Sequence, residues 1–203
     1  MTKKKTRNSH AVIVFLKDPV CGEVKTRIGH EIGMEKAAVL YRQLVNLTRK
    51  VLIDFPADIR MFVNKSPENF QRWRREDCFI DRQSDGDLGD KMLAAFQEME
   101  LLYDKILLIG TDCPELDKNI LNSAFKALDN HQLVLGPAVD GGYYLIGSQI
   151  SHPDLFRGIP WSTDEVLQKT MCKAKSLGLS VFLLPQLRDI DTMEDVKYYK
   201  DLG

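Results

Sequence analysis

The sequence predicts a single-domain α/β protein with three layers, α/β/α, in which helices cover both faces of a mostly parallel sheet. Short apolar runs rich in β-branched residues alternate with longer segments of helical period along the 203 residues. Such runs are typical of strands that a parallel sheet buries on both faces. No Pro/Ser-rich or charge-rich stretch interrupts the alternation, and a chain of this length can bury one sizeable core.

The strands are predicted from the apolar runs, in chain order. The first run, Ala-Val-Ile-Val-Phe-Leu at residues 11–16, follows a basic segment and is too short to span a membrane. Six further runs of apolar and β-branched residues predict the other strands. They cover residues 59–63, 78–80, 105–109, 133–135, 143–146 and 179–184, the last ended by Pro185.

The helices are predicted from spacing and from capping signals. Apolar residues at helical spacing predict a long amphipathic helix over 34–52 and a shorter one over 120–128. A Pro in the first turn predicts a short helix over 67–74, and the turn-rich loop 84–89 opens a helix to about residue 102. Capping boxes at Ser162-x-x-Glu165 and Thr192-x-x-Asp195 predict a helix to about residue 177 and a final helix.

The charge balance favours a small-molecule partner. Lys plus Arg (28) nearly equals Asp plus Glu (29), so there is no global basic field for nucleic acid or an anionic membrane. We predict no nucleic-acid partner, no membrane span and a cytoplasmic protein, since the four cysteines stand far apart without a C-x-x-C pair. Residues 1–10 are predicted to be a flexible basic N-terminal tail, and residues 11–203 one domain.

Two candidate groups follow predicted strands in the first half of the chain. Lys25 and Arg27 lie in a Pro/Gly-rich loop after the strand 11–16, where they could neutralise a diphosphate; a solvated basic loop is the alternative. Asp112 follows the strand 105–109, where a carboxylate needs a cation or backbone amides to offset its desolvation. We predict that Asp112 binds Mg²⁺ or Mn²⁺; capping of the next turn is the alternative.

Further candidates lie in the second half. Asp140 could orient a sugar or act as a base, and Gly141 and Gly142 could let the backbone approach a substrate, although Asp-Gly is also a common hairpin turn. Asp191 is a candidate second metal ligand or a helix cap, and Trp161 offers a flat face for stacking. All these groups follow strands, where an open α/β sheet places its ligand crevice.

Six motifs resemble the DUF2064 family of GT-A-like proteins over nearly the whole chain. They are Phe15-Leu-Lys-x-Pro…Gly22-x-Val-Lys-Thr-Arg27, Gly86-Asp-Leu-Gly89, Ile109-Gly-Thr-Asp-Cys-Pro114, Gly136-Pro-Ala-x-Asp-Gly-Gly-Tyr-Tyr-Leu-Ile-Gly147, Ile159-Pro-Trp-Ser-Thr163 and Asp189-Ile-Asp-Thr192. The resemblance implies the fold of the nucleotide-diphospho-sugar transferase superfamily. It also implies Mg²⁺ or Mn²⁺ on Asp112, with Asp191 as a second ligand, whereas the first acidic position of the superfamily's D-x-D motif is Gly110 here.

Three functions remain open from the sequence. The leading one is metal-assisted transfer of a sugar from a nucleotide-diphospho-sugar donor, with Lys25 and Arg27 on the diphosphate and Asp140 as base for the acceptor hydroxyl. The alternative is nucleotidyl transfer, in which a phosphorylated small molecule attacks a nucleoside triphosphate and releases pyrophosphate. The second alternative is a nucleotide-sugar binding protein with little turnover, suggested by Gly110. The sequence indicates neither the donor, the acceptor nor the oligomeric state.

Overall fold

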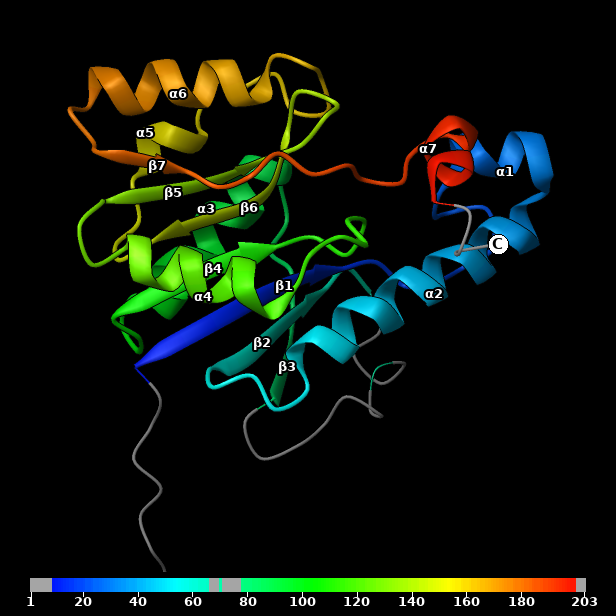
Figure 1. Ribbon diagram of the computed structural model, residues 1–203, viewed down its shortest axis with the longest axis horizontal. Helices are drawn as coiled ribbons and strands as arrows, with labels where there is room; N and C mark the ends of the chain where they lie inside the picture. The colour runs from blue at the N-terminus through cyan, green and yellow to red at the C-terminus, as the bar shows by residue number, and fades with distance from the viewer. Residues whose placement is uncertain (1–8, 66–69, 71–77, 200–203) are drawn as a thin grey trace, which may run out of the picture.

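The computed structural model describes residues 9–65, 70 and 78–199 and confirms the predicted three-layer α/β/α fold (Figure 1). The strands are β1 (His10–Leu16), β2 (Asp58–Val63), β3 (Cys78–Arg82), β4 (Lys105–Ile109), β5 (Leu133–Pro137), β6 (Tyr143–Ser148) and β7 (Val181–Leu183). The helices are α1 (Thr26–Ile32), α2 (Met34–Leu52), α3 (Leu88–Met99), α4 (Lys118–Ala127), α5 (Pro153–Phe156), α6 (Val166–Ser176) and α7 (Met193–Tyr198). No helix in these ranges is long and apolar enough to cross a membrane.

The seven strands form one sheet in the order β3-β2-β1-β4-β6-β5-β7. β6 runs antiparallel to both of its neighbours, and every other pairing is parallel. The predicted mostly parallel sheet is therefore confirmed. Because the parallel strands β1 and β4 are neighbours, the segments that leave their carboxyl ends start side by side.

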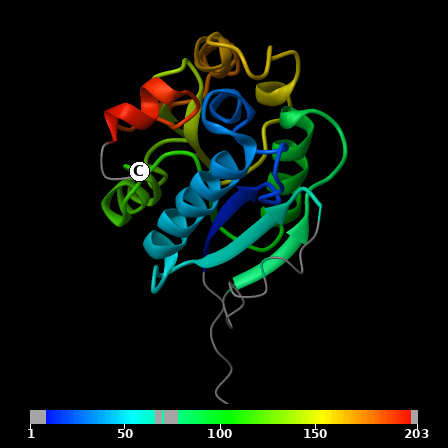
Figure 2. The same cartoon turned by 90° about the vertical axis from the view of Figure 1, so that its right-hand side faces the viewer.

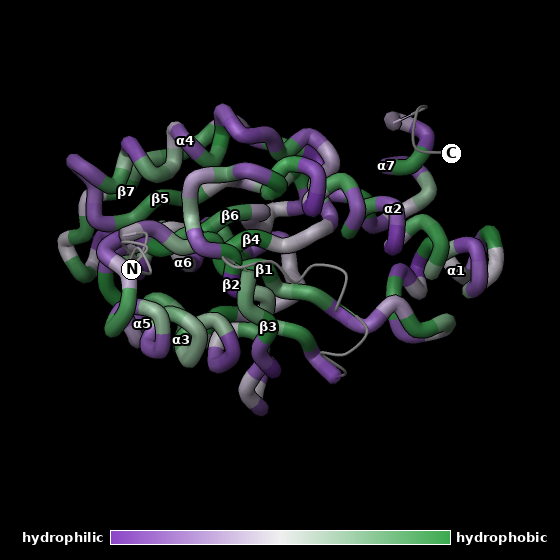
Figure 3. Tube along the Cα trace, turned by 90° about the horizontal axis from the view of Figure 1, so that it is seen from below, coloured by the Kyte–Doolittle hydropathy of each residue, from purple (hydrophilic) through white to green (hydrophobic). Residues whose placement is uncertain are grey.

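Helices cover both faces of the sheet, and each face has its own apolar core. On one face, Tyr41 and Val45 of α2 and Leu121 of α4 pack against alternate strand residues such as Val12. On the other face, α3, α5 and α6 pack against the opposite alternation. Figures 2 and 3 show the two helical layers with the apolar strands between them.

A third, smaller cluster lies beyond the carboxyl end of β1. Ile28 of α1, Leu40 and Leu44 of α2 and the fully buried Ile190 meet there, with residues of α7 packed against them. Figure 1 shows α1 and α7 side by side at this end of the molecule. The cluster holds the segment after β1 against the segment before α7, although these are far apart in sequence.

Several local expectations were wrong. The segment predicted as a loop around Lys25 contains α1, which is too short for a helical pattern and is stabilised by packing of Ile28 and Gly29. α5 was also missed, and the Ser162–Glu165 capping box does not form: α6 begins at Val166, and its N-cap residue Glu165 makes no side-chain capping bond. Ser162 instead has a left-handed backbone with φ 66°.

Other boundaries differ by a few residues or lie outside the described part of the chain. β7 is shorter than predicted, because the Leu179 amide closes the end of α6 by donating to the Ala174 carbonyl. α3 ends at Met99. The short helix predicted over 67–74 falls, apart from Phe70, outside the described residues, as does most of the predicted tail 1–10.

The capping box at the start of α7 is confirmed and gives a stability prediction. The Thr192 hydroxyl accepts from the Asp195 amide, and the Asp195 carboxylate accepts from the Thr192 amide at 2.8 Å. Replacing Thr192 with Ala should lower the free energy of unfolding by about 1 kcal/mol. Urea denaturation in EDTA would measure this, with Glu165→Ala as the control expected to change little. Equal losses in the two variants would contradict the assignment of the cap.

Candidate functional site

Lys25 joins two predicted metal ligands. Its ammonium nitrogen lies 2.9 Å from Oδ1 of Asp112 and 2.8 Å from Oδ1 of Asp191. The Lys25 side chain is only 5% exposed, whereas the two carboxylates are exposed by 43% and 41%. One buried cation therefore holds two carboxylates that keep an open side toward solvent.

Lys25 is held in an uncommon backbone conformation. It is the N-cap residue of α1, with φ 48° and ψ 43° in the left-handed region, which costs a non-glycine residue roughly 1 kcal/mol or more. Burial by itself lowers the pKa of Lys25, but the carboxylates of Asp112 and Asp191 raise it more, so its pKa lies above the ordinary value. The ammonium group is thus charged where it sits, and its charge is matched by the two carboxylates.

Backbone contacts bring Asp112 and Asp191 together. The Ile190 amide donates to the carbonyl of Asp112 at 2.9 Å, and the Cys113 thiol donates to the carbonyl of Arg188. The segment before α7 is thereby fastened along the loop that follows β4. Since Ile190 is fully buried in the α1–α2–α7 cluster, the Asp191 next to it points the other way, toward Lys25.

Tyr41 of α2 supports the other side of the same corner. Its hydroxyl accepts from the Lys17 amide at 2.8 Å and from the Thr111 hydroxyl at 3.4 Å. Burial, with the nearby Asp112 charge, raises the pKa of Tyr41 to about 12. The neutral phenol therefore ties the end of β1 to the end of β4, directly beside Asp112.

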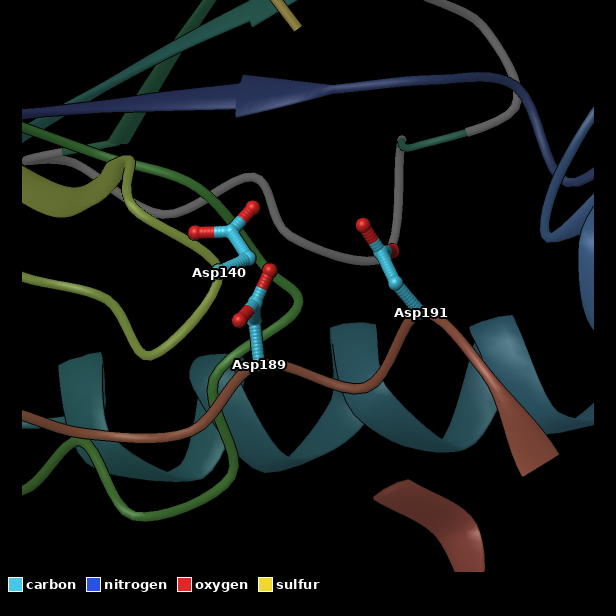
Figure 4. Close-up of side chains that lie close together, drawn as sticks. All are labelled: Asp140, Asp189 and Asp191. Atoms are coloured by element: carbon cyan, nitrogen blue, oxygen red, sulfur yellow. The ribbon is translucent and has the colours of Figure 1, made fainter. Parts of the chain in front are cut away.

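A parallel pairing sets Asp140 beside Asp189. Ala138 pairs with Leu187 in parallel, and the Val139 amide donates to the Leu187 carbonyl at 3.0 Å. Counting two residues onward along both segments leads to Asp140 and Asp189, which therefore lie on the same side. Figure 4 shows their carboxylates facing each other, with Asp191 beyond them on the same segment as Asp189.

The three carboxylates form a group that could hold a metal ion. One ligand atom from each of Asp140, Asp189 and Asp191 lies within 4.8 Å of the other two. Burial raises the pKa of Asp189 to about 7, and the charges of Asp140 and Asp191 add to this shift. A divalent cation would offset this crowding of negative charge, and carboxylate oxygens are ligands that Mg²⁺ and Mn²⁺ accept. The donor set thus fits the predicted metal.

The two glycines of the Asp140-Gly-Gly turn differ. A side chain at Gly141, with φ +89°, would meet the carbonyl oxygen of Asp164 at 2.2 Å, so this glycine allows the turn to pack on the start of α6. The Gly142 amide donates to the Asp140 carboxylate at 2.8 Å and fixes its direction. Contact of these glycines with a substrate, predicted from the sequence, stays a prediction.

Two joined clefts open at this edge of the sheet. The β1 cleft, of about 600 Å³, lies over the end of β1 and is lined by Lys17, Lys25 and Lys91 among others. The Trp161 cleft, of about 550 Å³, lies over the Asp140 turn and the loop before α6. Arg27, Gly110, Asp112 and Asp191 line both clefts. Each volume is typical of a small-molecule site.

Trp161 is fixed at one wall of its cleft by a glycine in α3. A side chain on Gly89 would meet the Trp161 indole nitrogen at 2.5 Å and the Phe156 carbonyl at 2.6 Å. The indole nitrogen is buried against this helix and makes no hydrogen bond to the described residues. The glycine of the Gly86-Asp-Leu-Gly89 motif therefore permits the close packing that positions Trp161.

The structure brings most of the predicted site residues together at one edge. Lys25, Asp112 and Asp191 are in contact, Asp140 adjoins Asp191, and Arg27 and Trp161 line the clefts. Sequence reasoning missed Asp189 as a member of the acidic group. Its alternation with Asp191 across a fully buried Ile190 was the available signal, but its partner Asp140 depends on a pairing between distant segments.

Known proteins with this fold include nucleotide-sugar enzymes. A protein from Desulfovibrio desulfuricans G20, provisionally described as a nucleotide-diphospho-sugar transferase, is 34% identical, with 96% of this chain and 87% of that chain covered and a TM-score of 0.89. A 4-diphosphocytidyl-2C-methyl-D-erythritol synthase from Anaerococcus prevotii DSM 20548 is 10% identical, with 94% of each chain covered and a TM-score of 0.57.

A third similar structure is Rv0371C from Mycobacterium tuberculosis H37Rv in complex with manganese. It is 13% identical, with 95% of this chain and 98% of that chain covered and a TM-score of 0.51. At these low identities the second and third structures show a shared fold alone. No curated protein sequence matches the chain.

The family follows from sequence. Residues 47–163 match the model of the family described as "Uncharacterized protein conserved in bacteria (DUF2064)". This match and the 34% identity to the D. desulfuricans protein over 96% of the chain show that the chain belongs to the DUF2064 family.

Proposed function

We propose that this protein is a cytoplasmic transferase that moves a sugar from a nucleotide-diphospho-sugar donor to an acceptor, assisted by Mg²⁺ or Mn²⁺. The observation that carries the proposal is the carboxylate group Asp140, Asp189 and Asp191 where two clefts meet, with buried Lys25 beside it. The description of the 34% identical D. desulfuricans protein supports the donor class. Because a fold hosts many functions, the site carries the argument.

Lys25 and Arg27 are proposed to bind the donor's diphosphate. When the bond from the sugar carbon to the diphosphate oxygen breaks, negative charge develops on the departing diphosphate, and preorganised cations stabilise it. Arg27 lines both clefts, whereas Lys25 already pairs with Asp112 and Asp191. Lys25 would leave at least one carboxylate to donate to a phosphate oxygen. Its left-handed backbone at the start of α1 aims it at this junction.

The acidic group is proposed to hold the divalent cation, which when bound neutralises charge on the departing diphosphate. Asp191 reaches both Lys25 and the carboxylate group, so it links the diphosphate site to the metal site. Asp112 can join it once Lys25 moves. Asp140 is the proposed base for the acceptor hydroxyl if it is not taken up as a metal ligand.

Binding of Mn²⁺ separates these roles. Asp189→Asn keeps the shape of the side chain and removes a charge, so we expect the affinity for Mn²⁺ to fall by about tenfold or more. Electron paramagnetic resonance of free Mn²⁺ would measure it. The control is Asp117→Asn, because Asn can also cap α4.

Two further variants complete the comparison. If Asp140 is a ligand, Asp140→Asn should weaken Mn²⁺ binding in the same way; if it is the base, Mn²⁺ binding should persist while transfer is lost. A large loss in Asp112→Asn with none in Asp189→Asn would place the metal between Asp112 and Asp191 instead, and would contradict the three-carboxylate site.

Nucleotidyl transfer is the second candidate, because Lys25 between Asp112 and Asp191 would suit a nucleotide's α-phosphate equally well. A thermal-shift panel of nucleoside triphosphates and nucleotide diphosphate sugars, each with Mg²⁺, Mn²⁺ or EDTA, distinguishes the two. A ligand at about 100 times its Kd adds roughly 2.7 kcal/mol. We expect metal-dependent stabilisation by a diphosphate sugar. Stabilisation by triphosphates alone would favour nucleotidyl transfer, and binding without turnover would favour a binding protein.

A further inference from the structure

The two clefts differ in charge, and this difference bears on the acceptor. Of the charged residues that line only the β1 cleft, three are cations and two are carboxylates: Lys17, Lys25, Lys91, Glu23 and Asp87. Of the described charged residues that line only the Trp161 cleft, all are carboxylates: Asp140, Asp164 and Asp189. Arg27 is the cation found in the Trp161 cleft, and it is shared with the β1 cleft.

The walls of the Trp161 cleft also differ in kind. Trp161 is held against Gly89, and Tyr143 of β6 lies beside it among the cleft's lining residues. Tyr143 is neutral, because burial raises the pKa of its phenol well above the ordinary value. Flat apolar rings next to carboxylate oxygens suit a compound with apolar C–H faces and hydroxyl donors.

Resting on the proposed function, we infer that the Trp161 cleft binds an acceptor that carries hydroxyl groups and no phosphate or carboxylate. Hydroxyl groups can donate to the acidic side chains, and hydrogen bonds to a charged acceptor are strong ones. A phosphate would face Asp140, Asp164 and Asp189 together, and like charges placed side by side are unfavourable. Arg27 cannot offset this, because it also serves the proposed diphosphate site.

The inference also separates the two candidate reactions. Nucleotidyl transfer needs an attacking phosphate, so its second substrate is anionic at the reacting group. Sugar transfer needs only an attacking hydroxyl, whose proton an Asp carboxylate can accept. The acidic lining of the Trp161 cleft therefore favours sugar transfer to a neutral hydroxyl compound.

Trp161 gives the test a local readout. The sequence contains one other tryptophan, Trp73, so in a Trp73→Phe variant all tryptophan emission comes from the cleft wall. Three matched pairs of probes would be titrated: glucose and glucose 6-phosphate, glycerol and glycerol 3-phosphate, and inositol and inositol 1-phosphate. Each titration would be run in EDTA and again with Mg²⁺ and inorganic pyrophosphate, which stands in for the donor's diphosphate.

We expect a neutral member to change Trp161 emission at a concentration about tenfold or more below its phosphorylated partner, in both conditions. Asp164→Lys should reduce this preference or reverse it. The matched control is Asp154→Lys, the same charge change on exposed α5 outside both clefts, which should leave the preference unchanged. Tighter binding of the phosphorylated members in the wild-type cleft would overturn the inference.

The remaining outcomes are also decisive. If no probe alters Trp161 emission and Asp164→Lys gains no phosphorylated ligand, the cleft is not an acceptor site and the inference is wrong. Failure of the proposed function looks different: Mg²⁺ with pyrophosphate, and the nucleotide panel, would give no thermal stabilisation while neutral probes still bind at Trp161. In that case the cleft remains a site for hydroxyl compounds in a protein with another activity.

Discussion

The ammonium group of Lys25, shared between Asp112 and Asp191, is the interaction on which the rest of the site depends. It joins the loop after β1, the loop after β4 and the segment before α7. Removing one partner of such a buried pair leaves charge unmatched, which costs more than the pair gains. The fold offsets this risk by supplying two carboxylates for one cation, and both remain open to solvent on one side. The same cation is then available to a phosphate.

A second constraint divides the site into two halves. The pairing of Ala138 with Leu187 continues the sheet past the ends of β5 and β7, and it fixes Asp140 beside Asp189. Because β6 is antiparallel, the β5–β6 turn returns over the carboxyl edge of the parallel strands rather than the opposite edge. Acidic groups from this turn thus gather next to the basic residues that follow β1, and the charge contrast between the clefts is a consequence of topology.

Sequence patterns predicted the elements that are long or buried on both faces, and missed those that depend on partners. The strand over 11–16 and the helix over 34–52 were predictable because their own residues bury them. α1 was not, since seven residues form a helix here only by packing against α2 and Ile190. Likewise Asp112 could be predicted from its place after β4, whereas Asp189 could not, because its neighbour is set by pairing with a distant segment.

Gly110 connects these observations. A side chain there would meet nothing within 4 Å, so packing does not require glycine at this position, and its lack of a side chain leaves the junction of the two clefts open. Where the superfamily's motif would place a first acid, this chain has Asp140 and Asp189 across the junction instead. On the proposed function, the carboxylates would hold the metal from the far side, and the space over Gly110 would admit the sugar as it passes from the donor to the acceptor.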